Sequence, residues 1–237
     1  MEVLNAADYG AVTSRERLIV QAVRKSSGEK IYWPEPTHEK EPEIRLFENV
    51  AQPWRSAAEI IDWSIPGESI FNRKKPLCAN TLRRIEAGIH KYWGAWAEPF
   101  LIVLRGTSSH AINSTAIPLS TPLPTLTAGG EHVALIQPLF IPQHSGGTVK
   151  PVMNPLSTVA TTGSIGVVEG RVLTLPDGSN YQLDITHRML TARELAAATS
   201  FPENYVFCGG DTAAKKQIGN AVPPVLAEAL YRAVLAA

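Results

Sequence analysis

Positively charged side chains are concentrated between residues 70 and 93, where six of them accompany a single acid. The preceding stretch, residues 29 to 70, has the opposite bias, with nine acidic and four basic side chains. Because lysine and arginine neutralise phosphates and release their counterions, the cluster indicates a phosphate-binding face. A solvated helix face with scattered cations explains the composition equally well. The six cations are Arg73, Lys74, Lys75, Arg83, Arg84 and Lys91.

Two shorter stretches also have residue types suited to binding. Arg15 and Arg17 lie directly before a mostly apolar run, and alone they are most simply arginines that pair with acids at a strand edge. The run GNAVPP begins at Gly219. Glycine lets a backbone approach a ligand closely, and N–H groups at a helix N-terminus attract an anionic group. Alternatively, or in addition, Asn220 caps the last helix.

Histidine and cysteine give no sign of a metal site. No two of the six histidines stand at ligand spacing on a helix, and Cys78 and Cys208 are far apart in the sequence. We therefore expect no metal. Two cysteines are also too few for a disulfide framework, and a free cysteine is commonly a small buried apolar residue.

Regular structure is expected to be sparse in the first part of the chain. Residues 17 to 24 predict a buried strand. Prolines recur from residue 33 to residue 76 and exclude a long helix there, leaving one short helix at residues 57 to 63. From Asn80, the predicted cap, apolar residues recur at helical spacing as far as Trp93, and this pattern predicts an amphipathic helix.

Residues 99 to 185 are rich in β-branched residues, glycine, serine and threonine, which predicts short strands joined by turns. Within this region, residues 122 to 136 and residues 155 to 169 match without gaps at an offset of 33. Two copies are too few for a solenoid, so duplicated hairpins are the simpler interpretation.

Helices are predicted again near the end of the sequence. Thr191 and Glu194 have the spacing of a capping box, so a helix should begin there and end before Phe201. A last helix should begin between residues 220 and 224, because prolines are tolerated in a first helical turn.

Composition describes an ordinary soluble protein of one large or two smaller domains, with 44% hydrophobic and 19% charged residues among 237. No apolar run approaches the roughly 20 residues of a membrane helix. The first ten residues have neither a basic start nor an apolar core, so we expect a cytoplasmic location. The formal net charge of zero argues mildly against nucleic acid, whereas the uneven distribution argues for it.

Three stretches, taken together and in order, resemble the cytosine-5 DNA methyltransferases. They are NAADYGAVTSRERLIV at residues 5 to 20, HRMLTARELAAATSFPENYVF at residues 187 to 207, and KQIGNAVPPVLAEAL at residues 216 to 230. A fourth stretch, SIFNRKKPLCANTLRRIEAGI, resembles the recognition region of a phage and prophage-like branch. The resemblance covers the C-terminal half of such an enzyme.

The resemblance implies roles for particular residues. Arg15 and Arg17 match arginines that hold the flipped cytosine and its phosphate, with Arg17 expected nearer the base. One departure is Thr13, where the family usually has glutamine. Gly219, Asn220 and Ala221 match the stretch that contacts S-adenosyl-L-methionine. The implied partner is double-stranded DNA, methylated as in restriction-modification.

The family's nucleophile is a cysteine that directly follows a proline and precedes the two arginines. Neither Cys78 nor Cys208 fits this position, and Glu48-Asn49-Val50 has the family's activating tripeptide on the wrong side of the arginines. We therefore expect a second chain to supply the nucleophile and the cofactor loop. The alternatives are a catalytically inactive DNA-binding module and the product of a decayed gene.

The fold class that follows is α/β, with part of a mixed-sheet methyltransferase domain and a smaller, irregular, β-rich target-recognition lobe. Residues 1–29 are expected to belong to the catalytic domain, residues 30–185 to recognise DNA, and residues 186–237 to form closing helices that return to the catalytic domain. The predicted phosphate contacts are those of Arg73, Lys74, Lys75, Arg83 and Arg84.

Overall fold

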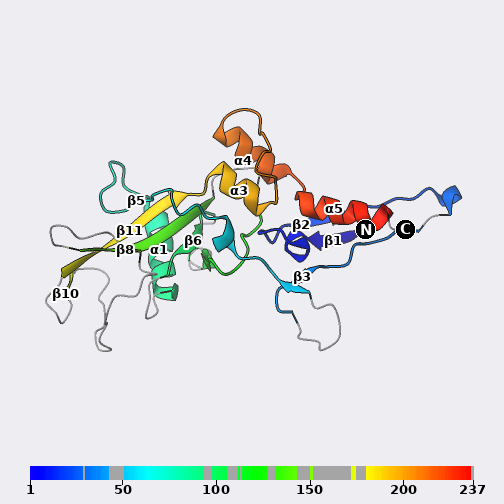
Figure 1. The fold of residues 1–237 in the computed structure, drawn as a ribbon. Helices are drawn as coiled ribbons and strands as arrows, with labels where there is room; N and C mark the ends of the chain where they lie inside the picture. Colours follow the sequence, from blue (N-terminus) through cyan, green and yellow to red (C-terminus); the bar gives the residue numbers. More distant parts are fainter. Residues whose placement is uncertain are drawn as a thin grey trace. The chain divides into compact units, whose positions relative to one another are not determined.

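A computed structural model describes residues 1–28, 30–42, 51–92, 98–105, 112, 114–127, 132–142, 150–151, 172–174 and 180–235 (Figure 1). The chain divides into two compact units. Unit 1 is Met1–Asp62, Leu119–Glu131 and Leu190–Ala237, and unit 2 is Trp63–Pro118 and His132–Met189. Both strands and helices are present, so the fold is mixed α/β. Unit 1 takes in residues 30–62 and 119–131, which the sequence-based domain boundaries grouped with the recognition region.

The N-terminal sheet of unit 1 consists of two antiparallel strands, β1 (Glu2–Asn5) and β2 (Glu16–Ile19), separated by the 3-10 helix η1 (Ala6–Tyr9). Asn5 caps η1, because its side chain accepts a hydrogen bond from the Ala7 N–H at 3.0 Å. The strand predicted at residues 17 to 24 is therefore present but shorter, and it ends at Ile19. The expectation that it is buried is wrong, since its residues are exposed or half-buried.

The two faces of this sheet differ in what covers them. Leu4 packs on a cluster that includes Tyr9 and Leu226, and Leu226 belongs to helix α5 (Pro224–Leu235), drawn beside β1 and β2 in Figure 1. Val3 and Leu18 pair across the ladder, so their side chains share the opposite face, where they are 63% and 64% exposed. The flanking residues Met1 and Val20 are exposed as well. Met1, Val3, Leu18 and Val20 are called the apolar strip below.

Three helices follow residue 190 in unit 1. Helix α3 (Ala192–Ala198) has the predicted capping box, in which the Thr191 hydroxyl accepts from the Glu194 N–H and the Glu194 carboxylate accepts from the Thr191 N–H. It ends before Phe201, as predicted. Helix α5 begins at Pro224, which confirms the proline-led start of the last helix.

Helix α4 (Asp211–Asn220) was not predicted, so the expectation of two closing helices is wrong. Its N-cap is Gly210, which has no side chain to cap it, and few apolar residues mark its buried side. One signal was available in the sequence. Asp211 and Lys215 are four residues apart and form an ion pair at 2.8 Å, a spacing that supports a helix.

The segment from Leu119 to Glu131 belongs to unit 1 although it follows strand β7 of unit 2. Leu123 donates through its N–H to the carbonyl of Val12 and accepts from the N–H of Ser14. The 3-10 helix η3 (Ala57–Ile60) bonds to the same segment through Ala57 and Ala58, and it confirms the short helix predicted near residue 57. Two short strands, β3 (His38–Glu39) and β4 (Gln52–Pro53), pair in parallel.

Unit 2 is an antiparallel sheet with strand order β10-β11-β8-β6-β7. Strand β5 also pairs with β11, and β9 pairs with β8. The predicted strand-rich character of residues 99 to 185 is confirmed for the described residues. The strands are β5 (Glu68–Ser69), β6 (Phe100–Val103), β7 (Ala116–Pro118), β8 (Val133–Pro142), β9 (Lys150–Pro151), β10 (Val172–Thr174) and β11 (Asn180–Met189).

Helix α1 (Ala79–Tyr92) covers one face of this sheet. The core between them consists of Ile85, Ile89, Phe100, Ile102, Ala116, Ala134, Ile136 and Ile185. Gly88 lets the helix lie close to the sheet, because a Cβ atom there would be 2.1 Å from the ring of Phe100. Unit 2 therefore has a hydrophobic core of its own.

Details of α1 differ from the prediction. Cys78, rather than Asn80, precedes the first helical residue, and its carbonyl accepts hydrogen bonds from the N–H groups of Thr81 and Leu82. Leu82 was expected to be buried and is 41% exposed, whereas Arg84 was expected outside and is 5% exposed. Apolar spacing alone did not fix which side of the helix faces the sheet.

Other sequence features lie outside the described residues. These are the second internal repeat at residues 155 to 169, the tripeptide at residues 48 to 50, and Trp93. The first repeat, residues 122 to 136, begins in unit 1 and ends in β8 of unit 2. Among the described residues, no helix is long and apolar enough to cross a membrane.

Candidate functional site

Arg15, at the start of β2, is entirely buried, with 0% of its surface exposed. Its two terminal nitrogens donate hydrogen bonds to the carbonyls of Leu126 and Gly219, each at 2.5 Å. Its Nε atom has no hydrogen-bond partner among the described residues. The guanidinium thus joins β2 to two segments that are 111 and 204 residues away in the sequence.

Arg17 has a different environment, two residues further along the same strand. Its side chain is partly exposed, and it donates a hydrogen bond to the carbonyl of the neighbouring Glu16 at 2.9 Å. Partial burial lowers the pKa of Arg17, but a guanidinium remains charged at neutral pH. Of the two predicted arginines, Arg17 is the one whose charged group can be reached from solvent.

Thr13, the departure from the family pattern, is also fully buried. Its hydroxyl donates to the carbonyl of Pro124 at 3.2 Å, and its backbone forms a bridge with Leu123. Thr13 and Arg15 therefore hold the same loop, residues 123 to 126, against the start of β2.

Gly219 and Asn220 are the last two residues of α4, and Ala221 is its C-cap. The Ala221 N–H is already used, since it donates to the carbonyls of Gln217 and Ile218. These residues stand at the negative end of a helix dipole. The argument that N–H groups at a helix N-terminus attract an anion here is therefore wrong, and so is the idea that Asn220 caps the last helix, which begins at Pro224.

Asn220 is nevertheless suited to contact a cofactor. Its side chain is exposed, and no described residue bonds to its amide. An amide offers both donors and an acceptor, which suits the amino and carboxylate groups of S-adenosyl-L-methionine. The backbone groups of its neighbours are less available, because the Gly219 carbonyl accepts from Arg15 and the Ala221 N–H donates within α4.

The five cations predicted to contact phosphate fall into two groups. Lys74, Lys75 and Arg83 are exposed. Arg73 is partly buried and pairs with Glu68 at 3.0 Å, and Arg84 is buried and donates to the carbonyl of Arg105 at 3.2 Å. Exposure therefore favours the first three as phosphate contacts.

Both cysteines are free and exposed, contrary to the expectation of buried apolar residues. Hydrogen bonds from Thr81, through its hydroxyl and its N–H, lower the pKa of the Cys78 thiol. Cys208 lies in the loop between α3 and α4, and its carbonyl accepts a hydrogen bond from Gln217. Among the described residues, no three histidine, cysteine or acidic side chains group as a metal site would require.

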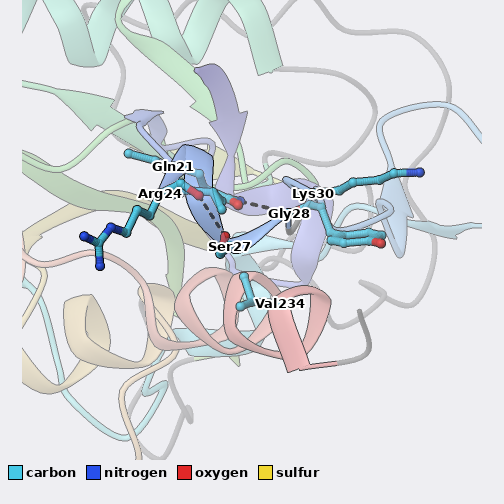
Figure 2. Close-up of a pocket in the computed structure, with 9 residues that line it drawn as sticks. Gln21, Arg24, Ser27, Gly28, Lys30 and Val234 are labelled. Atoms are coloured by element: carbon cyan, nitrogen blue, oxygen red, sulfur yellow. Dashed lines mark hydrogen bonds between the residues drawn. The ribbon is translucent and has the colours of Figure 1, made fainter.

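A pocket of about 680 Å³ in unit 1 is shown in Figure 2. Val234 of α5 and eight residues between 21 and 32 line it, including Gln21, Arg24 and Lys30. Hydrogen bonds from Ser27 to the carbonyl of Arg24 shape the loop on one side. The pocket contains none of the predicted site residues.

Comparison with known proteins agrees with the sequence resemblance. A putative type II methyltransferase of Oceanobacillus iheyensis is 26% identical over 98% of this chain and 60% of its own length. A type II methyltransferase of Neisseria gonorrhoeae is 28% identical over 98% of this chain and 48% of its own length. A third, from Haemophilus parahaemolyticus, is 57% identical over 49 residues, which are 21% of this chain and 13% of that protein.

The chain thus spans about half the length of the relatives that it matches from end to end. No solved structure matches it. The model of the C-5 cytosine-specific DNA methylase family matches residues 1–236. The chain therefore belongs to the C-5 cytosine-specific DNA methylase family.

Proposed function

We propose that this chain is the C-terminal part of a DNA cytosine-5 methyltransferase, which recognises double-stranded DNA and contributes to an S-adenosyl-L-methionine pocket. The observation that carries the proposal is the family match over residues 1–236, which contains both the Arg15–Arg17 pair and the Gly219–Ala221 run. In such an enzyme the cofactor supplies the methyl group, and a cysteine thiolate bonds to the ring of a flipped cytosine.

Within the proposed enzyme, Arg17 contacts the flipped cytosine or its phosphate. Its partly exposed guanidinium can donate several hydrogen bonds at once, which suits both groups. Asn220 contacts the cofactor through its free amide. Unit 2 recognises DNA, and Lys74, Lys75 and Arg83 bind phosphates because they are the exposed ones among the five predicted phosphate contacts.

We further propose that the nucleophile and the cofactor loop come from sequence other than residues 1–237. Two observations support this arrangement. The match covers only 60% of the Oceanobacillus relative and 48% of the Neisseria relative, so a large part of each lies outside it. The apolar strip leaves one face of the β1–β2 sheet uncovered, whereas sheets in α/β domains are usually covered on both faces.

A DNA-binding module without catalysis is the second candidate. The specific observation in its favour is that unit 2 has its own core and has exposed cations that include Lys74, Lys75 and Arg83. Such a unit can bind DNA whether or not unit 1 takes part in catalysis.

Transfer of a labelled methyl group to DNA separates the two candidates. The chain is mixed with a polypeptide that carries the family's Pro-Cys and Glu-Asn-Val elements. We expect transfer by the mixture, and a loss of at least about 100-fold in Arg17→Ala, the range for one positioned catalytic donor. Arg24→Ala, an exposed cation of the same unit, is the matched control and should leave transfer unchanged.

Failure of the mixture to transfer methyl groups, while the single chain still retards DNA on a gel, would favour the binding module. Equal loss of methyl transfer in Arg17→Ala and Arg24→Ala would mean that Arg17 is not part of the proposed site.

A further inference from the structure

We infer that Arg15 is a positioning residue that holds the Gly219–Ala221 segment in place, and that it does not itself contact cytosine. The importance of that segment for the cofactor rests on the proposed function. The structural part of the inference rests on contacts within unit 1 alone.

The burial of Arg15 distinguishes it from a residue that binds a base. Its guanidinium is fully buried, and both terminal nitrogens already donate to backbone carbonyls. A base or phosphate contact would require breaking these two bonds and would leave the carbonyls of Leu126 and Gly219 without partners in the interior. Arg17, on the same strand, needs no such change.

The geometry of arginine explains how one side chain can hold two segments. A guanidinium is a rigid, planar fork, so its terminal nitrogens donate in fixed directions that differ from each other. One of them fixes the carbonyl of Leu126 in the loop held by Thr13, and the other fixes the carbonyl of Gly219 at the end of α4. The position of Gly219 is therefore tied to the start of β2.

The charge of Arg15 has a second effect at the same place. The C-terminal end of α4 carries partial negative charge, which would repel an anionic group near Asn220 and Ala221. No carboxylate among the described residues pairs with Arg15, so its positive charge is balanced by carbonyl dipoles that include Gly219. The cation thus offsets the partial negative charge at the end of the helix where the cofactor is proposed to bind.

Amide hydrogen exchange in the free chain, without DNA or cofactor, tests the positioning role. The Ala221 N–H is the reporter, because it is bonded within the last turn of α4. In Arg15→Met we expect exchange at Ala221 to become at least about tenfold faster, since the local structure opens more often. Arg15→Lys should give an intermediate rate, because one ammonium group cannot replace a fork that reaches two carbonyls.

Arg17→Met and Arg17→Lys are the matched controls on the same strand and should leave Ala221 exchange unchanged. Unchanged exchange at Ala221 in Arg15→Met, with β1 and unit 2 still protected, would overturn the inference. Acceleration in the Arg17 variants equal to that in the Arg15 variants would also overturn it.

A measurement on the unaltered protein covers the case in which the Arg15 variants do not fold. Nitrogen-15 spectra of the Arg15 side chain should show separate, slowly exchanging signals for the two terminal NH₂ groups, as two fixed hydrogen bonds require. A single averaged signal would mean that the group rotates freely and would contradict the inference. Neither experiment depends on methyl transfer. The positioning role of Arg15 can therefore fail while the proposed function stands, and the proposed function can fail while the positioning role stands.

Discussion

The two sheets of this protein differ in how completely their apolar residues are covered. In unit 2, both faces of β6 are buried, since Phe100 and Ile102 face the core under α1 and Leu101 between them is 0% exposed. In unit 1, the β1–β2 sheet is covered by α5 on one face, and Val3 and Leu18 on the other face remain mostly exposed.

This difference indicates different degrees of independence. A two-stranded sheet is marginally stable alone, and an uncovered apolar face usually marks a surface that binds another protein. Unit 2 has the core that a separately stable domain needs, whereas the N-terminal sheet of unit 1 is suited to continue into a larger structure. The following variants test that contrast.

The largest effect is expected from Phe100→Ala in unit 2. Phe100 is 1% exposed, and its ring lies against Gly88 and Tyr92. Removing a buried aromatic ring typically costs about 3–5 kcal/mol of unfolding free energy. Hydrogen exchange should report this loss in β6 and β8 but not in β1. Glu86→Ala, on the exposed side of α1, is the control. Equal loss of hydrogen-exchange protection in both units of Phe100→Ala would contradict the proposed difference between them.

Replacing three exposed cations of unit 2 should affect DNA binding without affecting the fold. In Lys74→Gln/Lys75→Gln/Arg83→Gln we expect weaker binding to all DNA sequences. The slope of log affinity against log salt should decrease by about 0.9 for each phosphate that is no longer neutralised. The matched control, Lys25→Gln/Lys30→Gln, changes exposed lysines of unit 1. An unchanged slope in the unit 2 variant would remove these cations from the proposed DNA interface.

The apolar strip should be unimportant for the free chain and important for its partner. Val3→Thr/Leu18→Thr places a β-branched residue at both strand positions, so we expect unfolding free energy to stay within about 0.5 kcal/mol. Binding of a polypeptide that carries the Pro-Cys and Glu-Asn-Val elements, measured by sedimentation, should weaken at least about tenfold, because less apolar area would be buried at the interface. Unchanged binding would mean that this face is not where the partner docks.

A small pH effect is expected in unit 2 from His187, which is 7% exposed. Burial lowers its pKa and the charge of Arg73 lowers it further, while Glu68 acts in the opposite direction. In the unfolded chain the pKa of His187 is about 6.5, so the unfolded state binds a proton more readily than the folded state. The free energy of unfolding should therefore decrease as the pH falls below about 6.5.

Denaturant unfolding at a series of pH values above about 5, where carboxylates of ordinary pKa stay ionised, checks the role of His187. His187→Leu should reduce the pH dependence in this range, and His90→Gln, an exposed histidine of α1, should retain it. The same pH dependence in His187→Leu would assign it to another group.

Sequence reasoning succeeded where local chemistry determines the structure. The capping box at Thr191 and Glu194 and the proline at the start of α5 each act within one helical turn, so neighbouring residues suffice to predict them. Helix α4 was missed because Gly210 offers no capping side chain. The spacing of Asp211 and Lys215 was its one clear local signal.

The site was less predictable, because burial depends on residues distant in the sequence. Arg15 and Arg17 look equivalent as an arginine pair, yet only Arg15 meets the carbonyls of Leu126 and Gly219. Arg84 likewise appears as one cation in a cluster and is buried against the sheet. In both cases the deciding contacts come from residues outside the local sequence pattern, at least 21 positions away in the chain.

The central proposal is that the thiol which bonds to cytosine lies outside residues 1–237. Incubating the single chain with DNA that contains 5-fluorocytosine and with S-adenosyl-L-methionine tests it, because a catalytic cysteine becomes covalently trapped on this base. We predict no trapped complex for the chain alone and a complex on the second polypeptide in the mixture. A covalent complex formed by the chain alone, and abolished in Cys78→Ser or Cys208→Ser, would contradict the proposal.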